Sequence, residues 1–248
     1  MATTRSARRA APPPRDTDET PFAAILSDLL ARVPGAFAAA LVDVLGETVD
    51  YTGRADPFDV KIAAAHWHIV LTELASLTWL GAPRTLVIRA AMKSFLVHTL
   101  SDEYAVVVLL GRRAGFGASK RALAVCERAL ATEAGWTVRP AAQQCHAVNV
   151  ECDRARRPAR IRFQPSGPPT SLEVLGSVMG LAARERGYRV RLESGAELTL
   201  VRETGGFWYA DENFSPANVR SYRPAARSSP PAPPRPPRTR RPPPPDRA

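Results

Sequence analysis

Five short β-compatible runs stand in two groups on either side of one long apolar helix, and this arrangement restricts the fold more than any other feature of the chain. The first group comprises residues 37–44 and 47–51, and the second comprises residues 84–89, 94–99 and 103–110. Only a few residues separate neighbouring strands within a group, whereas a parallel pair needs a crossover of about a dozen residues or more. We therefore expect one antiparallel sheet.

Two further helices flank this pattern. Thr20 and Pro21 suit the N-cap and the first position of a helix, and Pro34–Gly35 ends the apolar periodicity that follows. A final helix is expected over residues 118–134, with Gly135 as its stop. The predicted order is α-β-β-α-β-β-β-α, an α+β fold with a five-stranded antiparallel sheet flanked by helices.

The helix between the strand groups, expected over residues 56–80, has an apolar arc of about 200°. A helix that covers only its own sheet needs a stripe somewhat wider than about 100°. The extra width predicts a second partner, either the same helix of another copy or the second region of this chain. His66 and Glu73 point the same way within the arc. In an antiparallel helix pair they would meet across the two copies, and otherwise both lie at a wet edge.

The run from Ile25 to Ala36 (ILSDLLARVPGA), followed by Ala40–Asp43 and Gly46, resembles the opening of Roadblock domains, the dynein light-chain type. The order of elements fits too, as does the Gly-x-Gly-x-x-Lys-Arg run over Gly115–Arg121. The resemblance covers about residues 21–136, a little under half of the chain. It implies a five-stranded antiparallel sheet between helices, and a homodimer joined through the central helix and the strand at 84–89.

The dimer interface predicted in this way consists of positions on that helix and that strand. They are Ile62, His66, Ile69, Glu73, Leu77, Leu86 and Ile88. Roadblock proteins are not enzymes, and they bind small Ras-like GTPases, act as scaffolds or stimulate a GTPase. The resemblance therefore implies a non-catalytic homodimeric regulator or anchor of a small Ras-like GTPase. The alternatives are a nucleotide-independent scaffold protein whose β-module and basic tail recruit other partners, and a nucleic-acid-associated protein.

The second half of the chain predicts a separate unit. We expect a Roadblock-like domain over residues 21–137 and a small mostly-β domain over residues 138–222, either an antiparallel sheet or an SH3-like barrel. Alternating runs in the second domain are separated by good hairpin turns such as Ser194–Gly195. Trp208 and Tyr209 are neighbours in one strand and face opposite ways, so we expect one to be buried and the other to be partly exposed.

Positive charge gathers in the C-terminal tail. Residues 220–248 hold eight arginines and one acidic residue, whereas residues 22–136 hold eleven residues of each sign. Residues 1–20 and 223–248 are rich in proline and arginine, offer little to bury and are expected to be disordered. By charge, the C-terminal tail would bind nucleic acid or an anionic surface weakly. It would otherwise be a ligand for a proline-reading domain, or have no specific role.

The chain lacks a recognisable catalytic or cofactor motif. Cys145, His146 and Cys152 lack the paired spacing and the fourth ligand of a zinc site. The glycines of residues 111–117 precede a helix, where a phosphate can bind, but the full P-loop pattern is missing and a plain strand-to-helix loop is favoured. No apolar run reaches the roughly 18 residues of a membrane span, and no signal peptide is evident. We expect a cytoplasmic protein without catalytic residues, cofactor or metal.

Overall fold

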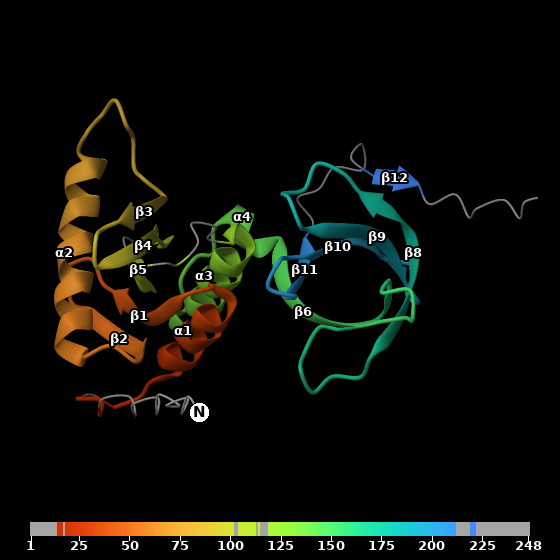
Figure 1. Ribbon diagram of the computed structural model, residues 1–248, viewed down its shortest axis with the longest axis horizontal. Helices are drawn as coiled ribbons and strands as arrows, with labels where there is room; N and C mark the ends of the chain where they lie inside the picture. Colours follow the sequence, from red (N-terminus) through yellow and green to blue (C-terminus); the bar gives the residue numbers. More distant parts are fainter. Residues whose placement is uncertain are drawn as a thin grey trace, which may run out of the picture.

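The computed structural model describes residues 14–16, 18–101, 104–112, 114, 119–211 and 219–221, and its first part is an α+β unit (Figure 1). The elements are α1 (Pro21–Arg32), β1 (Ala36–Val42), β2 (Thr48–Gly53), α2 (Pro57–Ala75), β3 (Thr85–Arg89), β4 (Lys93–Thr99), β5 (Ala105–Gly111) and α3 (Lys120–Ala134). The strands form one antiparallel sheet in the order β2-β1-β5-β4-β3. This confirms the predicted fold class.

Local sequence signals set the ends of the helices. Thr20 and Asp56 each cap a helix by accepting a hydrogen bond from the N–H two residues on, over 3.2 and 2.9 Å. Gly135 ends α3 with a left-handed backbone, at φ 73°. The prediction for α2 was too long, because this helix ends at Ala75 and not near residue 80. Trp79, beyond its end, is 80% exposed, so its apolar character does not reflect burial against the sheet.

Helices cover both faces of the sheet (Figure 1). On one face, Val60 and Leu71 of α2 pack in a core with the inner side of the central strands. On the other face, α1 and α3 build a second core that includes Leu26 and Leu130. Strand β5, paired on both edges, is buried from Ala105 to Leu110. The two outer strands, β2 and β3, are the edges of the sheet.

The second part of the described chain is a closed β-barrel. Its elements are α4 (Pro140–Gln143), β6 (Cys145–Cys152), β7 (Pro158–Arg162), β8 (Thr170–Val178), β9 (Arg186–Leu192), β10 (Glu197–Arg202), β11 (Trp208–Asp211) and β12 (Val219–Ser221). The order β8-β7-β6-β11-β10-β9 closes into a ring because β9 also pairs with β8. The short β12 adds to the edge of β8. The expected small barrel is confirmed, with six strands in its ring, whereas α4 was not foreseen.

The outer wall of the barrel packs on α1 and α3. Tyr209 of β11 and Cys145 of β6 belong to the same core as Leu26 and Leu130. Trp208 faces the interior of the barrel, and the two neighbours are 7% and 0% exposed. The prediction that one of them is partly exposed was wrong, because the face of β11 that would meet solvent is covered by the first part of the chain.

Polar contacts hold the two parts together. Arg121 of α3 forms ion pairs with Glu203 at 3.1 Å and with Glu185 at 3.3 Å. Before the barrel, Arg139 donates two hydrogen bonds to the buried Glu127 of α3. Burial would raise the pKa of Glu127, but the hydrogen bonds from His98 and Arg139 outweigh it and lower the pKa below the usual value.

Part of the expected N-terminal tail has a defined position. Arg15 lies 2.5 Å from the buried carboxylate of Asp50 on β2, and Thr20 donates to the same carboxylate. Burial would raise the pKa of Asp50, but these two hydrogen bonds outweigh it and hold the pKa below its ordinary range. The expected disorder of residues 1–13 and 223–248 lies outside the described residues.

Candidate interaction surface

Helix α2 is apolar on the side that faces away from the sheet. Val60, Ala64 and Leu71 face the sheet and are at most 5% exposed. Ile62 and Ile69 lie on the opposite side of the helix, and both are 56% exposed. Large exposed apolar side chains on the outer face of a helix are typical of an interaction surface.

The structure brings together four of the five residues predicted for the dimer interface on the central helix. Ile62, His66, Ile69 and Glu73 lie on α2 within an arc of about 60° at about 100° per residue, whereas Leu77 lies beyond the end of α2 at Ala75. All five side chains are exposed. Phe58, in the first turn of α2, is 69% exposed and was missed. At 100° per residue it lies within about 40° of Ile62, so the helical spacing could have identified it.

The two predicted residues on β3 lie beside this face. Leu86 and Ile88 are half-buried and pack on the core under α2, whereas Val87 between them points to the other side of the sheet and is 40% exposed. Within the described residues, β3 pairs only with β4. Its outer edge therefore leaves backbone N–H and C=O groups without a strand partner, which is the usual template for pairing with another chain.

Ion pairs border the apolar face of α2 on both sides. Lys61 lies toward β2 and meets Asp16 at 2.8 Å, and that hydrogen bond is the main reason that the pKa of Asp16 is lowered. Asp59 lies toward β4 and meets Lys93 at 2.8 Å. The apolar residues between these pairs thus form a band with polar margins, and this band with the edge of β3 is the α2–β3 surface.

The barrel does not cover the α2–β3 surface. It packs on α1 and α3, on the other face of the sheet from α2 (Figure 1). The alternative in which the second region of the chain covers the extra width of the helix is therefore wrong. Among the described residues, no segment outside the first domain packs on this surface, which leaves it open to another molecule.

His66 and Glu73 are both exposed on the α2–β3 surface, two helical turns apart. The His66 ring meets the neighbouring Trp67 edge-on at 5.8 Å between ring centres. The contact between His66 of one copy and Glu73 of the other stays a prediction.

The cysteines and the histidine considered as metal ligands do not form a site in the described chain, and the glycine loop of residues 111–117 lies largely outside the described residues. Cys145 is buried in the core between the two parts, whereas Cys152 is exposed. Burial raises the pKa of the Cys126 thiol to about 12. Among the described residues, no group of three or more His, Cys, Asp or Glu side chains is placed to hold a metal ion. None of the described helices combines the length and the apolar character needed to cross a membrane.

Comparison with known proteins gives fold similarity alone. No family model matches the sequence, and no curated protein matches it either. Among solved structures, the chain is similar to a Roadblock/LC7 domain from Streptomyces avermitilis, with 23% identity and a TM-score of 0.33 over 44% of this chain and 88% of that chain. It is also similar to MglB from Myxococcus xanthus, with 19% identity and a TM-score of 0.40 over 48% of this chain and 98% of that chain.

A third similar structure is the gliding protein MglB from Thermus thermophilus, with 19% identity and a TM-score of 0.39 over 47% of this chain and 93% of that chain. Each of these three similarities leaves more than half of this chain uncovered. The first structure is a Roadblock/LC7 domain, and residues 21–136 of this chain resemble Roadblock domains in sequence.

Proposed function

We propose that this protein is a non-catalytic homodimer that regulates or anchors a small Ras-like GTPase in the cytoplasm by protein–protein binding. The observation that carries the proposal is the α2–β3 surface, where an uncovered apolar helix face adjoins an open strand edge. The GTPase as partner follows from the Roadblock resemblance of residues 21–136.

The shape of the α2–β3 surface supports pairing with a second copy. A twofold axis beside α2 brings the same patch of both copies together, as an isologous interface requires. Ile62 and Ile69 of each copy would then pack against the other copy's helix. The same axis would bring the two β3 edges side by side in an antiparallel sense, so their unpaired backbone groups would bond to each other.

The barrel supplies a second surface for the proposed dimer. Because it packs on α1 and α3, it stays accessible when two copies meet through α2. The ion pairs of Arg121 with Glu185 and Glu203 hold its orientation relative to the sheet. A dimer of this kind would present two barrels at fixed positions, which suits an anchor that holds a GTPase near further partners.

The test combines the oligomeric state with the nucleotide state of the partner. Sedimentation velocity of the full chain should give a dimer. Immobilised protein is then offered Ras-like GTPases from the source cell, loaded with GDP or with a non-hydrolysable GTP analogue, and any captured GTPase is purified and tested again alone. Binding in one nucleotide state only supports the proposal, whereas a monomer or the failure of every GTPase to bind in either state contradicts it.

The alternative is a nucleotide-independent scaffold protein. The packing of the barrel on α1 and α3 favours this alternative, because it gives the protein a second surface besides the Roadblock-like unit. Equal binding of partners in both nucleotide states would support this alternative. Binding that is lost when residues 223–248 are removed, and that weakens steeply with salt, would instead indicate nucleic acid.

A further inference from the structure

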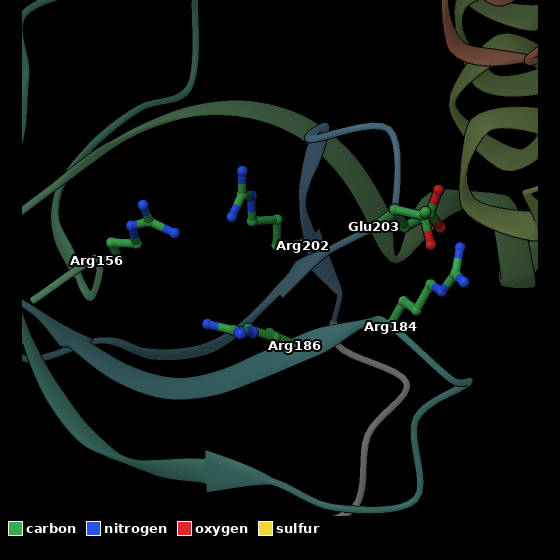
Figure 2. A pocket seen from close by; sticks show the side chains of 6 residues that line it. Arg156, Arg184, Arg186, Arg202 and Glu203 are labelled. Atoms are coloured by element: carbon green, nitrogen blue, oxygen red, sulfur yellow. The ribbon is translucent and has the colours of Figure 1, made fainter.

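Arginine side chains gather at one end of the barrel around a hollow of about 220 Å³ (Figure 2). The lining residues are Arg156, Arg184, Arg186, Arg202, Glu203 and Thr204. The guanidinium groups of Arg156, Arg186 and Arg202 surround one space, while Arg184 and Glu203 stand on the side toward the helices (Figure 2). These residues form the barrel mouth.

Two of the arginines occupy inward-facing positions in the strands. Tyr188 on β9 and Leu200 on β10 pack in the barrel core. Side chains two residues apart in a strand share a face, so Arg186 and Arg202 continue these inward series at the end of the barrel. They lie directly opposite each other in the β9–β10 ladder. On its other side, Arg202 is opposite Trp208, with its guanidinium carbon 6.0 Å from that ring centre.

The positive charge at the barrel mouth is not balanced by the described acidic residues. Like charges directly opposite in a ladder repel each other, and within the described part of the chain neither Arg186 nor Arg202 forms an ion pair. Glu203 lines the hollow, but it forms an ion pair with Arg121 of α3 at 3.1 Å. Other barrel arginines do have acidic partners: Arg160 and Arg162 pair with Glu151, and Arg189 and Arg191 pair with Glu197.

The backbone at Arg156 adds an independent indication. Its N–H donates to the carbonyl of Asp153 over 3.0 Å and closes the β6–β7 turn with a φ of 60°. The same turn joins three other strand pairs, and there the corresponding residues are Gly46, Gly195 and Gly206, with φ between 82° and 85°. This left-handed conformation is strained for a residue with a Cβ. Backbone strain of this kind is concentrated at active sites and ligand-binding positions.

We propose that the barrel mouth binds the diphosphate group of a small anionic molecule. A guanidinium group only donates hydrogen bonds, and its planar fork matches the oxygens of a phosphate. A phosphoryl group carries up to about two negative charges and three acceptor oxygens, so two linked groups balance the gathered arginines better than one carboxylate does.

The size and the surroundings of the hollow favour a compact ligand. At about 30 Å³ per water molecule, 220 Å³ corresponds to roughly seven waters, which is space for two linked phosphoryl groups. Proteins that bind a nucleic-acid strand offer a positively charged groove that follows its backbone. On the outer face of the barrel, Arg160 and Arg162 are instead paired with Glu151, and Arg189 and Arg191 are paired with Glu197. These pairs do not extend the unbalanced charge of the mouth along β7 or β9.

Calorimetric titration of the full chain with inorganic pyrophosphate tests this proposal. Arg186→Gln and Arg202→Gln should each weaken binding by roughly tenfold or more, because each removes charge-assisted hydrogen bonds. The matched control is Arg191→Gln, on the same strand as Arg186 and with the same loss of charge, but paired with Glu197 away from the hollow. It should leave the affinity within roughly twofold.

The variant Arg156→Gly separates binding from folding. Glycine relieves the left-handed backbone, so the melting temperature should stay the same or rise, while the affinity for pyrophosphate should fall. A nucleoside diphosphate serves as the second ligand. Affinity equal to that of pyrophosphate indicates a site for the free anion, and tighter binding indicates a nucleotide, and both outcomes support the proposal.

Three results would overturn it. The first is a wild-type protein that gives no heat of binding with millimolar pyrophosphate and shows no competition between pyrophosphate and the nucleoside diphosphate. The second is an Arg156→Gly protein that folds and keeps full affinity. The third is a single-stranded oligonucleotide that binds the mouth more tightly as its length grows, while pyrophosphate does not displace it.

Discussion

Replacing Ile69 with glutamate should break the proposed dimer and leave the protomer folded. In the protomer this side chain is 56% exposed on the outer face of α2. Complete burial of an isoleucine side chain contributes about 1.5–3 kcal/mol. The exposed part is therefore worth about 1–1.5 kcal/mol in each copy, or about 2–3 kcal/mol for a symmetric pair.

That free energy corresponds to a roughly 30- to 150-fold weaker dimer. The substitution also brings a new carboxylate close to Glu73 and its symmetry mate, so the loss should lie at the upper end of this range or beyond it. Sedimentation velocity over a concentration series measures the dissociation constant. Thermal unfolding under conditions where both proteins are monomeric should show nearly equal melting temperatures.

Thr72→Glu is the matched control, since it adds the same charge to an exposed position on the flank of the same helix. It should change the dissociation constant much less than Ile69→Glu does. Equal weakening by both variants would mean that net charge, and not apolar contact at Ile69, governs association. A wild-type protein that stays monomeric throughout the concentration series would refute the reasoning altogether.

Three more changes test other parts of the structure. Asp50→Asn should lower the free energy of unfolding by about 1–3 kcal/mol, because it leaves a buried hydrogen-bonded cluster incomplete. Since the pKa of Asp50 is lowered in the folded protein, denaturant titrations should show the full difference above about pH 4 and a shrinking one as the pH falls through the lowered pKa. Arg121→Ala should remove the ion pairs of Glu185 and Glu203, whose carboxylates are mostly buried between α3 and the barrel. Because this weakens the contact between the two parts, limited proteolysis should cut near the junction at residues 135–144 faster than in the wild type. Equal cleavage rates at this junction in the variant and the wild type would contradict the role given to these ion pairs. If His66 of one copy meets Glu73 of the other, Glu73→Gln should weaken the dimer by removing one partner of the contact. A Glu73→Gln protein with the wild-type dissociation constant would exclude the pairing.

Local signals were sufficient for most elements of the first domain, but not for the end of α2. The cap at Thr20, the stop at Gly135 and the short gaps between strands depend on the backbone of a few neighbouring residues. The same holds for the width of the apolar arc on α2, which is a property of helical spacing. The antiparallel sheet and the outward direction of Ile62 and Ile69 were therefore predictable from the sequence.

What covers each apolar face was decided by the tertiary structure. Periodicity shows that Trp208 and Tyr209 point opposite ways, but not that α1 and α3 bury the outer one. Periodicity also shows that the apolar arc of α2 is wider than its own sheet can cover, but not that the barrel packs on the opposite face of that sheet.

The barrel mouth depends on tertiary structure even more strongly. Arg156 is 46 positions from Arg202 in the sequence, and no local pattern relates them. Ring closure through β8 and β9 and the β9–β10 register bring them to one hollow. The sequence by itself determined which way each side chain points along its own helix or strand, because that follows from backbone geometry. Only the folded chain determined which side chains meet, because that depends on pairings between segments far apart in sequence.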